Sequence, residues 1–435
     1  TGAEAGQYAS IMIGYTGPVG STIQAAGNIV IGGYNQSTNL GVIVTTDSII
    51  TSTGGNVSIY GGSSGANGLQ IGWGDQSRAT ISAASGTLFI SGISNTGENV
   101  INGAELTAST INFTGMSNTT GNNGIRIGAN SGGYNVLTTN NLVLQADIIA
   151  FGQSAQSNPN NNNSYNVLWS AQSGNPTLRI ETYTNNSDGL KFVAYVGNGA
   201  SPTTTSLSGF RAMVGTSSTD VFPTLTSTTL SSLTLGKTTY TSVPIVVAVA
   251  QTVSGPINIY GAAVTVSSAL TATSNTITIN ANGAMTQTAA LSASNLVFNG
   301  SSSATYTLDQ SNTVSTQTTL SAGKIIASNN SALGVGSLSM AAGTTLQAGT
   351  TTVSLSNAIA MTGAATINAP NGDTLTLSGG VTGNFALTVN DVSSQTGTVV
   401  LSGANTYSGS TTISYGAFTV NGSGTLGSAG TYSAN

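Results

Sequence analysis

The chain has 435 residues, of which 38% are hydrophobic and 4% are charged; its formal net charge is −5, and it contains no histidine and no cysteine. Typical soluble domains carry about 25% charged residues, and disordered chains combine low hydrophobicity with high net charge, so the composition fits neither an ordinary globular enzyme nor a disordered chain. The missing residue types exclude His-dependent nucleophilic catalysis and Cys- or His-ligated zinc. The seven scattered Lys and Arg residues do not form the basic patch that nucleic acid requires.

Short apolar doublets recur along the whole chain. Each doublet alternates apolar, polar and apolar residues, which is the pattern of a strand with one buried face. Gly, Asn and Ser separate the doublets, and no apolar run approaches the roughly 18 residues that a membrane-spanning helix needs. The doublets include Ile29/Ile31, Val57/Ile59, Leu69/Ile71, Leu88/Ile90, Ile111/Phe113, Ile125/Ile127, Leu142/Leu144, Val264/Val266, Ile277/Ile279, Val353/Leu355, Leu375/Leu377, Leu387/Val389 and Val399/Leu401.

The pattern changes after a polar Asn-Pro-Asn run that starts at Asn158. Residues 160–237 hold seven of the nineteen charged residues, together with a concentration of aromatic residues. We therefore predict a small β-rich insertion, a hairpin or a β excursion, over residues 158–224. Its aromatic residues are interpreted either as a separate small core or as a glycan-binding surface. The set in question is Trp169, Tyr183, Tyr195 and Phe210.

Two architectures suit short, frequent strands: a series of antiparallel sandwiches or a parallel β-solenoid. Sandwiches would show longer strands and a period of about 100 residues, and the chain shows neither. In a solenoid the same position of successive coils lies about 4.8 Å apart, so a charged side chain would face its like, whereas Ser, Thr and Asn can form hydrogen-bonded ladders. This favours an all-β, parallel β-helix with β-helix sections at residues 1–157 and 225–435.

In the segment from Val399 to Gly430, short β-branched runs are separated by Gly, Asn and Ser, with almost no charge. Its characteristic positions are Leu401-Ser402-Gly403, Asn405, Tyr407, Gly409, Thr411-Thr412-Ile413, Gly416, Val420-Asn421-Gly422 and Leu426-Gly427. With these positions the segment resembles the autotransporter-associated β-strand repeat of secreted bacterial passenger domains; Ser410 and Phe418 depart from the family pattern. The resemblance implies that the β-helix is right-handed.

A second segment, from Ser254 to Gly300, is similar to the repeats of filamentous-haemagglutinin-type exoproteins. The similarity is carried by Gly255-Pro256-Ile257, Ile259-Tyr260-Gly261, Ile277-Thr278-Ile279 and the turn at 283–288. Both resemblances imply an exported protein, and the chain begins at Thr1 rather than at a methionine, so we expect it to be processed or a section of a larger protein.

The acidic residues give no pattern of catalytic chemistry. Glycoside hydrolysis uses two carboxylates within about 5 to 10 Å, whereas the twelve acids here occur singly. We interpret Glu98 and Glu105 as solvated rim residues and Asp75 as a turn cap. The Thr-x-Thr tracts at 271–273 and 276–278 suggest an ice-binding face, but their irregular spacing favours Thr ladders between coils. We predict no catalytic residue, no cofactor and no metal ligand.

The sequence thus predicts a secreted bacterial surface protein, an adhesin in the form of a stiff β-helical rod exposed outside the outer membrane. Its partners would be another cell surface, a glycan or further copies of itself, and not nucleic acid. The first alternative is a subunit of a self-assembling extracellular fibre, sheath or surface layer. The second is a β-helix polysaccharide lyase or glycosidase.

Overall fold

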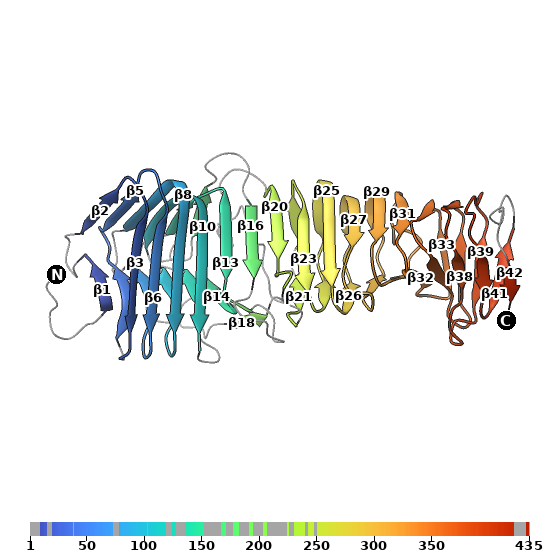
Figure 1. The fold of residues 1–435 in the computed structure, drawn as a ribbon, viewed down its shortest axis with the longest axis horizontal. Coiled ribbons are helices and arrows are strands. Elements are labelled where there is room, and N and C mark those ends of the chain that lie inside the picture. The colour runs from blue at the N-terminus through green and yellow to red at the C-terminus, as the bar shows by residue number, and fades with distance from the viewer. Residues whose placement is uncertain are drawn as a thin grey trace. The chain divides into compact units, whose positions relative to one another are not determined.

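The structure is a computed structural model of the 435-residue chain (Figure 1). Every secondary-structure element of the described residues is a β-strand, and among these residues no helix is long and apolar enough to cross a membrane. The chain divides into two compact units, Thr1–Gly236 and Lys237–Asn435. The described residues are 9–14, 20–37, 39–72, 78–101, 103–118, 124–127, 135–151, 167–170, 177–181, 191–194, 203–206, 224–225, 230–239, 242–247, 250–421 and 432–434.

The first unit is a coil in which each turn of the chain adds one strand to each of three parallel sheets, called faces 1, 2 and 3. Face 1 consists of β1 (Ala9–Ile13), β4 (Leu40–Val44), β7 (Leu69–Ile71), β9 (Val100–Ile101), β11 (Ile125–Ile127), β14 (Ile148–Phe151) and β17 (Lys191–Ala194). Face 2 consists of β2 (Thr22–Ala25), β5 (Ile49–Ser52), the first parts of β8 (Ala79–Ser94) and β10 (Ala104–Ser117), β12 (Asn135–Thr138), β15 (Val167–Ser170) and β19 (Thr224–Leu225). Face 3 consists of β3 (Ile29–Asn35), β6 (Val57–Ser63), the second parts of β8 and β10, β13 (Asn141–Gln145), β16 (Thr177–Glu181) and β20 (Ser232–Leu235).

The second unit repeats the same three-faced plan. Its face 1 consists of β21 (Ile245–Val247), β24 (Val264–Val266), β26 (Ala284–Gln287), β28 (Thr305–Leu308), β30 (Lys324–Ala327), β32 (Thr345–Ala348), β35 (Ala365–Asn368), β38 (Leu387–Val389), β40 (Thr411–Ile413) and β42 (Tyr432–Ala434). Its face 2 begins with β22 (Gln251–Val253) and the first parts of β25 (Leu270–Ala281), β27 (Leu291–Phe298) and β29 (Thr313–Leu320), and later coils supply β33 (Thr352–Leu355), β36 (Thr374–Leu377), β39 (Thr398–Leu401) and β41 (Ala417–Val420). Its face 3 consists of β23 (Ile257–Gly261), the second parts of β25, β27 and β29, β31 (Ser337–Met340), β34 (Ile359–Met361) and β37 (Val381–Thr382).

These pairings confirm the predicted all-β, parallel β-helix and rule out the alternative of antiparallel sandwiches. The antiparallel pairing among the described strands joins β17 to β18 (Thr203–Ser206). Within the predicted insertion at 158–224, β15, β16 and β17 each pair in parallel with a strand of the preceding coil. In particular, β16 lies between β13 and β20 as a rung of face 3, rather than as one arm of a hairpin. The bounds of the insertion stay a prediction.

The alternating doublets form buried rows that run from coil to coil. On face 3 of the first unit, one row consists of Ile29, Val57, Leu88, Ile111, Leu142, Leu178 and Leu233, all buried and in register. On face 1 of the second unit, the corresponding row consists of Val264, Met285, Tyr306, Ile325, Leu346, Ile367 and Val389. Each side chain covers the one below it, so a coil buries its apolar residues only through its neighbours.

Coil length differs between the units. In the first unit the residues in one row lie from 23 positions apart, between Leu88 and Ile111, to 55 apart, between Leu178 and Leu233. In the second unit, paired residues of neighbouring coils are as few as 19 positions apart, from Tyr306 to Ile325, and as many as 24 apart, from Val389 to Ile413. The turns therefore absorb the differences in length, while the strand register is kept.

A row of inward-facing glycines lies at the end of face 3 in the first unit. Gly33, Gly61, Gly92 and Gly115 are in register on β3, β6, β8 and β10. A Cβ atom at Gly61 would lie 2.1 Å from the Gly68 carbonyl oxygen, which is far inside van der Waals contact. The glycine row therefore allows the chain that enters face 1 to pass directly against face 3.

Replacement of Gly61 by alanine tests this close approach. We expect Gly61→Ala to lower the free energy of unfolding by about 2 kcal/mol or more, because the backbone must move to admit the methyl group. The matched control is Gly32→Ala on the outer side of β3, where an added Cβ has its nearest neighbour at 3.8 Å and should change stability by less than about 1 kcal/mol. Urea unfolding followed by circular dichroism measures both, and equal effects would contradict the interpretation.

Candidate functional site

The acidic residues singled out from the sequence lie in different surroundings. Glu105 is exposed on β10, as predicted for a rim residue. Glu98 is not a solvated rim residue: its side chain is 24% exposed, and its Oε2 lies 2.8 Å from Nε of Arg126. Asp75 lies outside the described residues. Among the described residues, no group of three or more acids is arranged to hold a metal ion.

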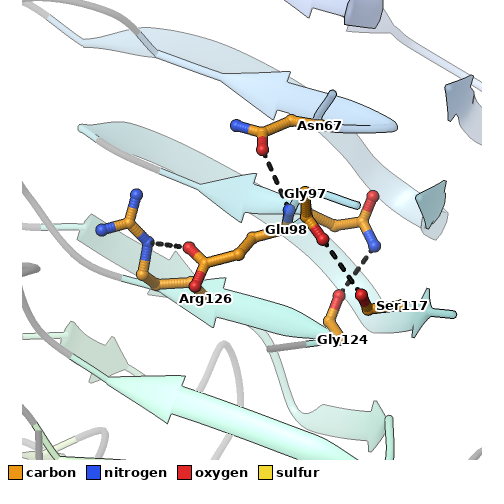
Figure 2. A network of polar contacts seen from close by, with 7 residues as sticks. Asn67, Gly97, Glu98, Ser117, Gly124 and Arg126 are labelled. Carbon is orange, nitrogen blue, oxygen red and sulfur yellow. Dashed lines mark hydrogen bonds and ion pairs between the residues drawn. The ribbon is translucent and has the colours of Figure 1, made fainter. Parts of the chain in front are cut away.

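Glu98 belongs to a polar network at the corner where the chain enters face 1 (Figure 2). The Glu98 backbone N–H donates to Oδ1 of Asn67 (2.9 Å), in the coil before. Its carboxylate pairs with Arg126 on β11, in the coil after. Ser117 Oγ donates to the Gly97 carbonyl oxygen (3.1 Å), so that three successive coils are joined at this corner.

Asn99, next to Glu98, is almost completely buried and is a second connection between coils. Its Nδ2 donates to the carbonyl oxygens of Gly92 (2.9 Å), Met116 (3.2 Å) and Gly124 (2.7 Å). No donor among the described residues reaches its Oδ1, which lies against Gly92, where a Cβ atom would be 1.9 Å away. The amide thus fills the space that the missing glycine side chain leaves.

The cavity beside Asn99 is too small for a substrate. It holds about 10 Å³ and is lined mainly by apolar side chains such as Leu69, Ile90 and Phe113, which is room for about one water molecule. With its acid held in an ion pair, this corner has the chemistry of a structural connection and not that of a catalytic site.

The ion pair between Glu98 and Arg126 gives a prediction about stability. Because the Glu98 side chain is still 24% exposed, although that of Arg126 is only 13% exposed, we expect a double-mutant cycle with Glu98→Gln and Arg126→Gln to give a coupling free energy of about 1 kcal/mol. This coupling should shrink as salt is raised. A coupling several times larger that does not depend on salt would show instead that the pair is a buried element of a site.

Buried asparagines form similar connections in the second unit. Asn390 accepts a hydrogen bond from the Ala369 N–H (2.8 Å) and donates to the carbonyl oxygens of Gly397 and Tyr415 (both 3.1 Å). Asn405 accepts from the Val381 N–H (2.9 Å). The sequence analysis expected asparagines to form hydrogen bonds between coils but did not single out these two, although Asn405 is one of the positions that carry the family resemblance.

Tyr306, like Tyr407, is a fully buried tyrosine of the second unit. Its ring packs on Phe298 with centroids 4.4 Å apart, and its Oη accepts a hydrogen bond from the Gly300 N–H (2.7 Å). Burial raises the pKa of the Tyr306 phenol above its ordinary value of 10.0, while backbone contacts with Gly300 and Ala281 partly lower it. This phenol is therefore a packing group, held neutral in the core.

The raised pKa of Tyr306 predicts a loss of stability in alkali. The folded state prefers the neutral phenol, so its contribution is complete below about pH 10 and is lost as pH rises toward the folded-state pKa. We expect Tyr306→Phe to unfold more easily at neutral pH, because the Gly300 N–H loses its acceptor. The variant should also show a weaker fall in stability above about pH 10. Tyr415→Phe, at an exposed tyrosine, should keep the wild-type pH dependence; an equal change in both variants would contradict the assignment.

The threonine tracts considered for ice binding lie in mixed rows. Thr271 lies between Thr252 and Ser292, as expected for a hydroxyl ladder. Thr278 instead lies between Asn258 and Val297, so the ladder prediction is wrong for this residue. A row of threonines in register that the sequence analysis missed lies on face 1 of the second unit: Thr345, Thr366, Thr388 and Thr412.

The aromatic residues proposed for the insertion are mostly not placed. Tyr183, Tyr195 and Phe210 lie outside the described residues, and only the backbone of Trp169 is placed, in β15. The choice between a small core and a glycan-binding surface in this region stays open.

The fold and the site chemistry together define a parallel β-helix whose described polar clusters join coils to one another. Comparisons of the chain with protein-family models, with curated proteins and with solved structures found no match. The resemblances noted in the sequence therefore stay predictions.

Proposed function

We propose that this chain is a section of a secreted bacterial surface protein that attaches cells to other cells or to glycans and has no enzymatic activity. Its β-helical coils would act as a stiff support outside the cell. The carrying observation is the unbroken parallel pairing of ten strands on face 1 of the second unit. Such pairing makes each coil the template for the next, which suits mechanical support.

The polar groups of the coil support this function. Cross-coil hydrogen bonds from Asn67, Asn390 and Asn405 reinforce the turns, where the strand ladders are interrupted. The near absence of charge is also consistent with an extended support, because equally charged coils stacked about 4.8 Å apart would repel one another.

Attachment of coated beads tests the proposal. Beads that carry the purified chain should adhere to a layer of bacterial or epithelial cells, and an excess of soluble chain should block this adhesion. Beads coated with the heat-unfolded chain are the control, since an adhesive surface made by stacked coils is lost on unfolding. Adhesion no greater than that of the control would contradict an attachment role.

The alternative of a self-assembling fibre, sheath or surface layer makes a different prediction for the same preparation. An attachment protein should appear as separate particles in negative-stain electron microscopy at micromolar concentration. Ordered filaments or sheets under these conditions would favour the assembly function. Release of reducing ends or unsaturated sugars from a polysaccharide panel would instead favour an enzyme.

A further inference from the structure

The outer side of face 3 in the first unit carries an unusual group of exposed apolar and aromatic side chains. Exposed fractions are 71% for Val30, 56% for Tyr34, 45% for Tyr60 and 40% for Ile93. They lie on β3, β6 and β8, which run side by side (Figure 1). Exposed apolar groups that gather in this way mark binding surfaces more often than scattered ones do.

Tyr34 lies over a glycine of the neighbouring strand and is 56% exposed. It lies in register with Gly62 on the neighbouring strand, and a Cβ atom at Gly62 would be 2.2 Å from Cδ2 of Tyr34. The ring therefore lies directly over the Gly62 backbone. Its Oη also lies 3.2 Å from Oγ of Ser64. The ring thus packs on the Gly62 backbone and is more than half exposed, so a ligand with a flat apolar surface can stack on it.

Tyr60 extends this surface across the sheet. It lies in register with Gly32 on one side and Ser91 on the other. Both residues are too small to flank the Tyr60 ring. Ile93 lies in register with Gly62, beyond the Tyr34 ring, and the half-buried Phe89 lies in register with Ser58. Small residues thus alternate with rings, and we call the surface made by Tyr34, Tyr60, Phe89 and Ile93 the tyrosine platform.

Charge selects the partner of this platform. The outward positions of β3, β6, β8 and β10 on face 3 are all uncharged, and those of β10 add Asn112 and Thr114 as hydrogen-bonding groups. A charged ligand would lose its hydration here and gain no ion pair. A partner of matching chemistry is neutral, with apolar C–H surfaces to lie on rings and hydroxyls to meet the polar groups.

We propose that the tyrosine platform binds a neutral polysaccharide. This inference rests on the proposed attachment function and names its partner class and its residues. Sugar rings present C–H groups that lie favourably on the electron-rich face of an aromatic ring, while their hydroxyls reach Tyr Oη, Asn112 and Thr114. Because neighbouring strands lie about 4.8 Å apart, a polysaccharide laid along the coil meets a new strand at each step.

Titration of the full chain with neutral hexasaccharides tests the platform. The probes are cellohexaose, maltohexaose and hexa-N-acetylchitohexaose, and a chondroitin sulfate hexasaccharide is the charged control; binding is measured by calorimetry. At least one neutral probe should bind, and the charged probe should not. Tyr34→Ala and Tyr60→Ala should each lower the association constant about tenfold.

Three further variants separate a stacking role from a general loss of structure. Gly62→Ala retains both tyrosines but displaces the Tyr34 ring, and should weaken binding. Tyr34→Phe retains the ring and should bind within about threefold of the wild type. Tyr415→Ala removes an exposed tyrosine of the second unit and should leave binding unchanged. Circular dichroism checks that each variant keeps its β-structure.

The platform is wrong if no neutral probe binds, if the two alanine variants bind like the wild type, or if Tyr415→Ala weakens binding equally. Analytical ultracentrifugation could instead show that the wild-type chain is a dimer and that Tyr60→Ala is a monomer. This result would also overturn the proposed polysaccharide site, because the partner of the platform would then be a second copy of the chain. Bead adhesion distinguishes failure of the platform from failure of the attachment function. If beads coated with the double variant Tyr34→Ala/Tyr60→Ala still adhere, only the platform proposal fails. If wild-type beads do not adhere, the attachment function fails, and the titration still judges the platform.

Discussion

In-register stacking of parallel strands is the constraint on which the rest of this structure depends. Neighbouring strands lie about 4.8 Å apart, so each inward position meets the same position of the next coil. On face 3 of the first unit this gives one row from Ile29 to Leu233, aliphatic throughout, although coil length more than doubles along it. Register, and not the length of the turns, is what the chain keeps constant.

The same constraint explains how polar groups are tolerated. A charge repeated in every coil would face its like, and the ion pair between neighbouring coils joins opposite signs, Glu98 and Arg126. Asparagine provides the other solution, because its side-chain amide can bond to the backbone of a neighbouring coil. Oδ1 of Asn56 accepts from the Thr87 backbone N–H, and the Asn56 backbone N–H donates to Oδ1 of Asn28, each at 2.8 Å, so the same kind of hydrogen bond recurs from coil to coil.

The strands were predictable from the sequence because alternation depends on one residue and its near neighbours. Doublets such as Val57/Ile59 and Leu375/Leu377 are buried strands in the structure. The low charge also allowed a parallel coil to be preferred over sandwiches. The exposed side chain of Glu105 followed from its surroundings in the sequence, whereas the pairing of Glu98 with a residue 28 positions later did not. Side-chain contacts between coils depend on the length of each turn. In the first unit this length varies irregularly, so the sequence alone does not show which residues lie next to each other.

The interior and the surface of such a coil are independent in sequence, since alternate residues point to opposite sides of each strand. Stacking restricts most inward positions to apolar residues, glycine or hydrogen-bonded polar residues such as Gln287 and Thr318, and sets few limits on the outward ones. Tyr34 and Tyr60 stand on strands whose inward residues, Ile31 and Ile59, serve the core. Gly62, which lies outward, is required by the Tyr34 ring above it rather than by the core. An outward glycine beneath an exposed ring is therefore best explained by the surface that it creates, which is the surface that we propose for binding.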